Sequence, residues 1–172
     1  MVALIIHLVI AIGVVAVIVA SNPQIFRQPA TPKVSVLEAV YYVAGIAATV
    51  IGYYFNLKYV NDYSQDYSQG SHNAIWGDHG SWKEFIQLGW ANPAVSSASS
   101  DYYITSLVVT PVFVIADGRR RGVRHAWLYV MFVLTASSTF GWAFYLATIG
   151  RQRRVTAGKT PQHGVVTGDT SR

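Results

Sequence analysis

Residues 2–20 read VALIIHLVIAIGVVAVIVA, an apolar stretch that contains no charged residue and one histidine, His7. At 1.5 Å per residue, an α-helix over this stretch is roughly 28 Å long, which is close to the hydrocarbon thickness of a bilayer. The alternative is a secretory signal peptide, but no Lys or Arg precedes the stretch, and it is longer than a typical signal core. The stretch therefore predicts a retained membrane-spanning helix.

Beyond this stretch the chain contains three more apolar segments long enough to cross a bilayer, and one shorter amphipathic segment. Ser35 and Glu38 form a capping box at the start of the first segment, because each side chain can bond the backbone N–H of the other residue. Ser81 and Glu84 form a second capping box, which opens a short helix that we expect to lie in the membrane interface. The expected helices are about 36–57, 82–89, 93–116 and 126–149.

The segment at about 93–116 carries the clearest signals for the start and the end of a helix. Asn92 is expected to cap its N-terminus, with Pro93 at the first helical position. Asp101 then lies inside the helix, about two turns from its start. Pro111 is expected to kink the helix, and the Asp-Gly pair at 117–118 is expected to end it.

The composition agrees with a membrane environment, because only 12% of the residues are charged, against roughly 25% in soluble domains. The net charge is +5, but the arginines lie beside apolar segments, at 119–124 and 151–154, so we expect headgroups as partners and no nucleic acid. The absence of cysteine excludes disulfides, thiolate metal sites and a cysteine nucleophile. The predicted fold class is an all-α integral membrane helical bundle of about four transmembrane helices plus one short interfacial helix.

The predicted organisation has three parts: an N-terminal transmembrane helix at 1–20, a membrane core at 21–154 and a disordered polar tail at 155–172. Four spans place both termini on the same side of the cell membrane. Lys and Arg are almost evenly divided between the two sides, so we apply the positive-inside rule only to residues near the helix ends. On that basis we expect both termini, and the long loop at 58–92, to lie outside.

Several short runs resemble one family in their order and spacing: Tyr53–Leu57, Phe85 followed by Ala91–Ala94, Asp101, Asp117–Arg120 and Trp127–Val130. From Tyr41 to Arg154 the chain is thus similar to a bacterial family of small membrane proteins known only as domain of unknown function 2834, which usually has Glu at position 117. The resemblance implies a three-helix membrane core, to which the helix at 2–20 is an addition. It implies no activity and no catalytic residues.

One carboxylate stands out as a candidate catalytic residue. Asp101 lies within an apolar helix, where a charge is costly and is usually paired, solvated or functional. Contact with headgroup water or with neighbouring polar residues is the alternative interpretation. Asn56 lies near the end of the preceding long helix, on the same side of the membrane. We therefore predict a polar and aromatic binding cluster of Tyr53, Tyr54, Asn56, Asp101 and Tyr102.

No metal and no cofactor is expected from the motifs. His72, Asp78 and His79 are close in sequence, but their spacing matches no common metal site. The chain also lacks a nucleophile elbow, a phosphate-binding loop and a dinucleotide fingerprint.

We therefore expect a small multi-pass membrane protein that is not an enzyme, either an accessory or scaffold subunit or a lipid-associated protein. Its expected partners are the lipid bilayer and another membrane protein or a second copy of the chain. The alternative is an intramembrane binder or enzyme for an apolar, isoprenoid-like molecule, with Asp101 as the acid. A transporter subunit, which requires an oligomer, is a third possibility. A cavity that reaches Asp101 favours the enzyme, and tight packing around Asp101 favours the scaffold.

Overall fold

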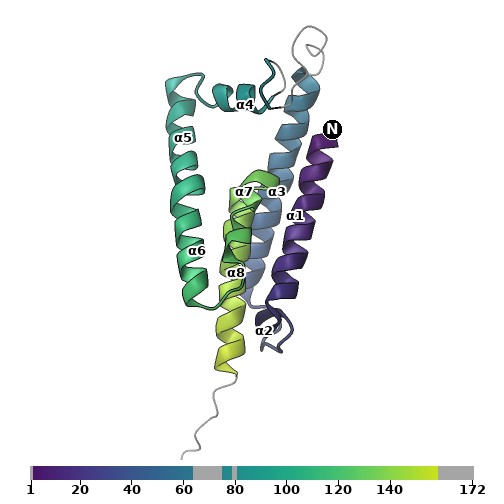
Figure 1. Ribbon diagram of the computed structural model, residues 1–172, viewed down its shortest axis with the longest axis vertical. Coiled ribbons are helices and arrows are strands. Elements are labelled where there is room, and N and C mark those ends of the chain that lie inside the picture. Colours follow the sequence, from purple (N-terminus) through teal and green to yellow (C-terminus); the bar gives the residue numbers. More distant parts are fainter. Residues whose placement is uncertain (1, 64–74, 79–80, 159–172) are drawn as a thin grey trace, which may run out of the picture.

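The computed structural model describes residues 2–63, 75–78 and 81–158, and all regular structure in these ranges is helical. The fold is an all-α bundle of long helices around a shorter hairpin (Figure 1). In chain order the elements are α1 (Val2–Ser21), α2 (Pro23–Phe26), α3 (Val36–Tyr63), α4 (Trp82–Leu88), α5 (Pro93–Ile104), a π-helical segment (Thr105–Val109), α6 (Thr110–Arg120), a 3₁₀ turn (Ala126–Tyr129), α7 (Phe132–Thr135) and α8 (Ser138–Ala157).

In the described part of the chain, three helical stretches are long and apolar enough to cross a membrane: Leu4–Ser21, Val36–Tyr59 and Pro93–Arg120. Only 11% of each stretch is buried inside the protein. Large apolar side chains therefore point away from the bundle, which suits a lipid environment and not water. The expected spans at 2–20, 36–57 and 93–116 agree with these helices, although the last two are longer than predicted.

The fourth expected span is wrong, because 126–149 does not form one helix. The 3₁₀ turn and α7 run into the bundle, the chain reverses at Ala136 and Ser137, and α8 runs back to the same end (Figure 1). Ala136 leaves the helical region at φ −141° and ψ −83°, and the Ser137 hydroxyl caps α8 by accepting from the Phe140 N–H at 2.9 Å. A serine that caps a new helix competes with continuation of the old one.

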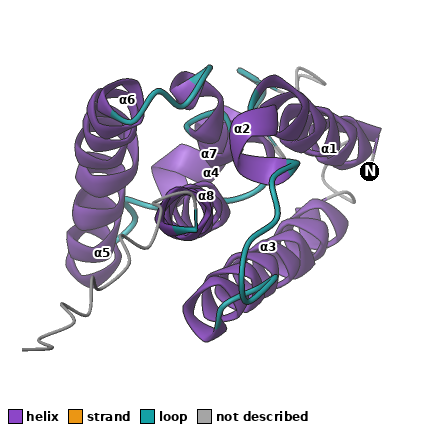
Figure 2. Cartoon of the chain, turned by 90° about the horizontal axis from the view of Figure 1, so that it is seen from below, coloured by secondary structure: helices purple, strands orange, loops and turns teal. Residues whose placement is uncertain are grey.

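In residues 126–157, called the hairpin below, the apolar part of each arm is too short to cross a bilayer, because the basic run of α8 begins at Arg151. The rise along α8 from Ser138 to Arg151 is roughly 20 Å, and the first arm is shorter still. Both values fall below the ~30 Å of the hydrocarbon core. Figure 2, which looks along the bundle, shows α8 lying between the three long helices. The largest fully buried side chains include Tyr129, Phe132 and Tyr145 of the hairpin.

Two glycines allow the hairpin to pack closely. A Cβ at Gly141 would clash with the Tyr129 carbonyl oxygen and lie 3.2 Å from the Phe132 Cβ. A Cβ at Gly45 of α3 would lie 3.3 Å from the Phe140 Cα. The small residues of the last segment thus serve the contact between the two arms, as well as contacts with the neighbouring helix.

The third long helix ends later than predicted, at Arg120 instead of about 116. Gly118 stays helical, since its missing Cβ makes room for Ala126; a Cβ there would lie 2.5 Å from the Ala126 Cβ. Gly122 takes the left-handed conformation at φ 69°, and the Val123 N–H donates to the Gly118 carbonyl at 2.9 Å. This arrangement is a Schellman motif, so the glycine that stops the helix is Gly122.

The expected irregularity at Pro111 takes the form of the π-helical segment that directly precedes α6. Proline cannot donate a backbone hydrogen bond, and its ring crowds the carbonyl four residues earlier. A wider π turn, here with the Thr110 N–H bonded to the Thr105 carbonyl, accommodates this crowding. The expected Asn92 cap is present, with its Oδ1 accepting from the N–H groups of Ala94 and Val95 at 3.1 Å.

The short helix α4 lies across one end of the bundle and connects α3 to α5 (Figure 1). Ser81 caps it, as the capping box predicts, by accepting from the Glu84 N–H at 3.2 Å. Its Phe85 ring packs against Tyr59 of α3, and its Trp82 ring lies 6.2 Å from His7 of α1. His7 is therefore an aromatic contact of α4.

The first and last helices point to opposite ends of the bundle. α1 begins at the end that carries α4, whereas α8 finishes at the other end (Figure 1). The expectation that both termini share one side does not fit this geometry, because it assumed a fourth crossing. Of the predicted disordered tail at 155–172, Val155–Ala157 belong to α8, and 159–172 lie outside the described residues.

Candidate functional site

The α3 residues of the predicted cluster do not form a common site with Asp101. The Tyr53 hydroxyl donates to the Thr135 carbonyl at 2.9 Å, at the tip of the hairpin. Tyr54 is 60% exposed and makes an edge contact with the Phe55 ring. Asn56 is partly buried, and its side chain makes no hydrogen bond within the described part of the chain.

The α5 residues of that cluster lie across the bundle from α3, with the hairpin between the two helices (Figures 1 and 2). Asp101 is exposed, and among the described residues its carboxylate has neither a hydrogen bond nor an ion pair. Tyr102 is also exposed and makes an edge contact with the Tyr103 ring. Asp101 therefore lacks the tight packing of the scaffold hypothesis, and it is not among the residues that line the cavity between the third long helix and α8 described below.

Basic side chains gather at the end of the bundle where the α1–α3 connection, the α6–hairpin loop and the last turns of α8 meet. Hydrogen bonds join these segments: Asn22 bonds the backbone of Arg124, and Gln152 donates to the Arg121 carbonyl at 2.7 Å. Apart from Lys58 and Lys83, every Lys and Arg that the structure describes lies here. We call the group the arginine end: Arg27, Lys33, Arg119, Arg120, Arg121, Arg124, Arg151, Arg153 and Arg154.

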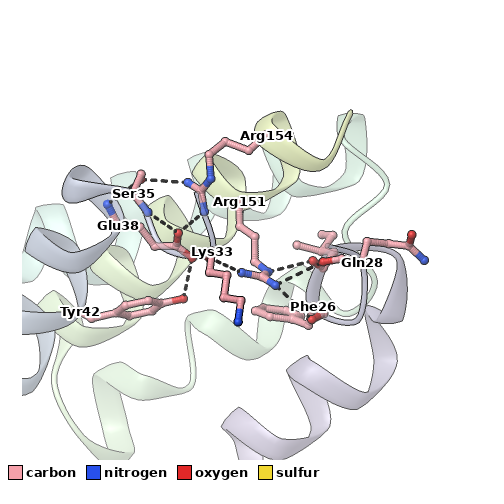
Figure 3. A network of polar contacts seen from close by, with 9 residues as sticks. Phe26, Gln28, Lys33, Ser35, Glu38, Tyr42, Arg151 and Arg154 are labelled. Carbon is pink, nitrogen blue, oxygen red and sulfur yellow. Dashed lines mark hydrogen bonds and ion pairs between the residues drawn. The ribbon is translucent and has the colours of Figure 1, made fainter. Parts of the chain in front are cut away.

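A buried ion pair ties α8 to α3 at this end. Glu38 is 2% exposed and pairs with the Arg154 guanidinium (Figure 3). The capping box is formed as predicted, with Ser35 Oγ accepting from the Glu38 N–H at 3.2 Å and from Arg154 at 2.9 Å. Tyr42 donates to Glu38 at 3.2 Å. The acid that caps α3 thus also anchors the end of the hairpin.

The Arg151 side chain donates hydrogen bonds to backbone carbonyls of α2 and of the loop that connects α2 to α3. Its Nε donates to the Ile25 carbonyl and its Nη1 to the Lys33 carbonyl, each at 3.0 Å (Figure 3). Its Nη2 reaches the carbonyls of Phe26 and Gln28 at 3.3 and 3.4 Å. A guanidinium offers five N–H donors in a fixed geometry, so one side chain can satisfy several carbonyls of an irregular loop.

The second acid at this end is also occupied. Asp117 accepts from Arg121 Nε at 2.6 Å and from the Tyr145 hydroxyl at 2.7 Å. The hydrogen bond from Arg121 to Asp117 raises the pKa of the Arg121 guanidinium, which stays charged. This cluster links the end of α6 to the middle of α8.

The other basic residues of the arginine end are exposed, and none of their side chains forms an ion pair within the described ranges. They are Arg27, Lys33, Arg119, Arg120, Arg124 and Arg153. Such a surface can bind anions, and guanidinium groups suit phosphate in particular. It offers no pair of groups for nucleophilic or acid–base catalysis.

Other candidate ligands fall elsewhere. Asp78 pairs with Lys83 at 3.3 Å on the α4 side, while His72 and His79 lie outside the described residues. Among the residues that are described, no group of three or more His, Asp or Glu could hold a metal ion.

The fold and its arginine end define a class: over the residues that the structure describes, the chain is an all-α bundle with three helices of membrane-spanning length, shorter apolar helices and one strongly basic end. The chain belongs to the family described as "Protein of unknown function DUF2834", which matches residues 40–152. This match confirms the family resemblance seen in the sequence. It includes the hairpin as far as residue 152, and so Arg151, but neither α1 nor the Glu38–Arg154 pair. Neither the curated proteins nor the solved structures include a match.

Proposed function

We propose that this chain is a multi-pass protein of the cell membrane, without catalytic activity, that associates with anionic lipid through its arginine end. The observation that supports the proposal is the set of exposed basic side chains that lack an acidic partner there, while Glu38 and Asp117 are already paired. Basic residues at the ends of membrane helices are attracted by anionic headgroups, by about 1 kcal/mol for each residue near the surface.

In the proposed arrangement the arginine end faces the cytoplasm. Lys and Arg near the membrane are enriched on that side. With the four spans predicted from the sequence, the two sides of the membrane carry similar numbers of Lys and Arg, because the arginines at 151–154 then lie opposite those at 119–124. If the hairpin returns to the side on which it starts, both groups share one side. The proposed topology has the start of α1 outside and the end of α8 inside.

Single-cysteine labelling tests this topology, since the chain has no cysteine of its own. The exposed positions Thr31, Ala91 and Thr156 are each changed to Cys, and intact cells are treated with a thiol reagent that cannot cross membranes. We expect Ala91→Cys to react in intact cells, and Thr31→Cys and Thr156→Cys to react only after permeabilisation. Reaction of Thr156→Cys together with Ala91→Cys would mean a fourth full crossing. The reverse pattern at all three positions would invert the orientation.

Bound lipid is measured separately by native mass spectrometry of the protein extracted in mild detergent. The variant replaces Arg119, Arg120, Arg124 and Arg153 with Gln, and we expect it to lose most of its bound anionic lipid. The matched control replaces Lys58 and Lys83 at the other end and should keep its lipid. Equal anionic lipid on all three proteins would contradict the lipid role. A second protein in stoichiometric amount would instead favour an accessory or scaffold subunit.

A further inference from the structure

A partly open cavity of about 480 Å³ lies between the third long helix and the start of α8, away from the arginine end. Its walls include Thr105, Ser106 and Thr110 from the π-helical segment and the start of α6. Ser138 and Thr139, the first two residues of α8, line the facing side. Thr105–Thr110 lie at the centre of the stretch Pro93–Arg120, which places the cavity near the middle of the bilayer.

The hydroxyl groups of this cavity have no hydrogen-bond partner in the described part of the chain. Several hydroxyls elsewhere in the helices donate to the carbonyl four residues earlier, as those of Thr49, Thr148 and Ser100 do at 2.7–3.0 Å. By contrast, the side chains of Thr105, Ser106, Thr110, Ser138 and Thr139 make no hydrogen bond within the described ranges.

Ser106 is the most buried of the five residues: it is only 4% exposed, and its hydroxyl has no hydrogen-bond partner among the described residues. A polar group without a partner is costly in an apolar environment, and water is scarce at this depth. A bound molecule that supplies the missing polar atom would remove that cost.

The break in the hairpin adds further donors. The N–H groups of Ser138 and Thr139 are in the first turn of α8, where no carbonyl of the helix can accept from them. The Ser137 hydroxyl, which caps α8, accepts from the Phe140 N–H and not from the N–H groups of Ser138 and Thr139. The positive end of the α8 dipole is also directed here. Since the cavity lining contains no charged residue, its chemistry suits an uncharged molecule with hydrogen-bond acceptors.

Two aromatic rings in the cavity wall favour a ligand that contains a flat ring. Phe113 and Trp142 both line the cavity, in edge contact with ring centroids 5.2 Å apart. They offer an apolar surface against which a flat ring can pack. The volume is within the range of pockets that hold small organic ligands.

The depth of the site distinguishes two sources of an acceptor oxygen. Ester carbonyls of bilayer lipids lie near the headgroups, about 15 Å from the mid-plane of a core of roughly 30 Å. A lipid-soluble quinone can carry its ring and carbonyls to the mid-plane. We propose that the cavity binds the carbonyl-bearing ring of a lipid-soluble quinone, with the hydroxyls and the α8 N–H groups as donors. Asp101 does not line this site. The proposal therefore differs from the hypothesis, based on the sequence, of an isoprenoid-like ligand with Asp101 as the acid.

Binding is tested with decylubiquinone as the probe and the full chain in detergent, by quenching of tryptophan fluorescence. The native protein should show a saturable component. The variant Thr105→Val, Ser106→Ala, Thr110→Val removes three hydroxyls with little change of shape, and we expect its Kd to rise on the order of tenfold or more. The control Thr49→Val removes a hydroxyl that is already bonded to the Gly45 carbonyl, and its Kd should match that of the native chain.

Thermal unfolding of the three proteins accompanies the titration, so that loss of binding is separated from loss of fold. The proposal is supported when the triple variant unfolds like the native chain and binds more weakly. It is overturned when quenching is unsaturable, or the same in the native chain and the variant. Displacement of the quinone by ethyl decanoate at equal concentration also overturns it, because the occupant would then be an ester lipid. Neither result depends on the arginine end, so the proposed function is tested independently.

Discussion

The long helix α3 and the hairpin contain similar apolar side chains but bury them to very different degrees. On α3, Ile46 is 56% exposed and Val50 is 62% exposed. In the hairpin, Tyr129 is 1% exposed and Phe132 is 0% exposed. Apolar composition therefore shows that a segment avoids water, but it does not show whether lipid or protein surrounds the segment.

The two regions also differ in how they satisfy their backbone. A continuous helix such as α3 bonds its own N–H and C=O groups. The hairpin breaks its helix inside the bundle, so groups at the break depend on other partners. Tyr53 of α3 donates to the Thr135 carbonyl, and Ser137 accepts from the Phe140 N–H. We therefore expect substitutions that detach the hairpin to be more damaging than similar substitutions on the outer faces of the long helices.

The largest effect is expected from Arg154→Ala. This change leaves Glu38 buried and unpaired, which costs about 3–5 kcal/mol of unfolding free energy. Thermal unfolding in mild detergent measures the loss. The control is Lys83→Ala, which breaks the exposed pair with Asp78 and should cost less than about 1 kcal/mol. Equal, small losses for the two variants would show that the end of the hairpin is not anchored through Glu38.

An intermediate effect is expected from Gly141→Ala, because the new Cβ would meet the Tyr129 carbonyl in the other arm of the hairpin. Overpacking of this kind typically costs about 1–3 kcal/mol. Gly150→Ala in the same helix has nothing within 4 Å of the added Cβ and should be neutral or stabilising by up to about 1 kcal/mol. Unfolding midpoints that fall in the opposite order would rule out the close contact between the arms.

The smallest effect is expected from Tyr53→Phe, which removes one donor from the Thr135 carbonyl and should cost about 1 kcal/mol. Hydrogen exchange of the backbone amides at 136–141 should also become faster, since the tip of the hairpin loses a tether. Tyr54→Phe is the matched control, because Tyr54 is 60% exposed and makes only a ring contact in the described part of the chain. An identical exchange pattern in the two variants would count against the role of Tyr53.

Local signals in the sequence predicted the parts of the fold that depend on neighbouring residues. The capping box at Ser35–Glu38 is formed, and at Ser81–Glu84 the Ser81 hydroxyl caps the helix as predicted. The cap at Asn92 is formed as well. Each of these bonds joins residues two or three positions apart, so the sequence alone contains both partners.

The candidate site was harder to predict, because its parts come from distant positions. Arg154 and Glu38 are separated by 116 residues, and Asn22 and Arg124 by 102. The sequence did carry one signal for the ion pair, an acid at the start of one helix and a basic run at the end of another. Nothing local showed that those two ends meet, since that depends on the direction in which α8 runs.

By itself, the sequence determined an all-helical membrane fold, the family, and the first three long helices, because length and apolarity suffice for these. Only the tertiary structure decided that the last apolar segment turns back at Ala136 and Ser137. A serine in an apolar run is compatible with a continuous helix or with a cap, and the choice depends on packing by residues such as Tyr53 and Gly45 from another helix. That turn brings the arginines at 119–124 and at 151–154 to one end of the bundle. It also places the start of α8 beside the cavity that faces the third long helix.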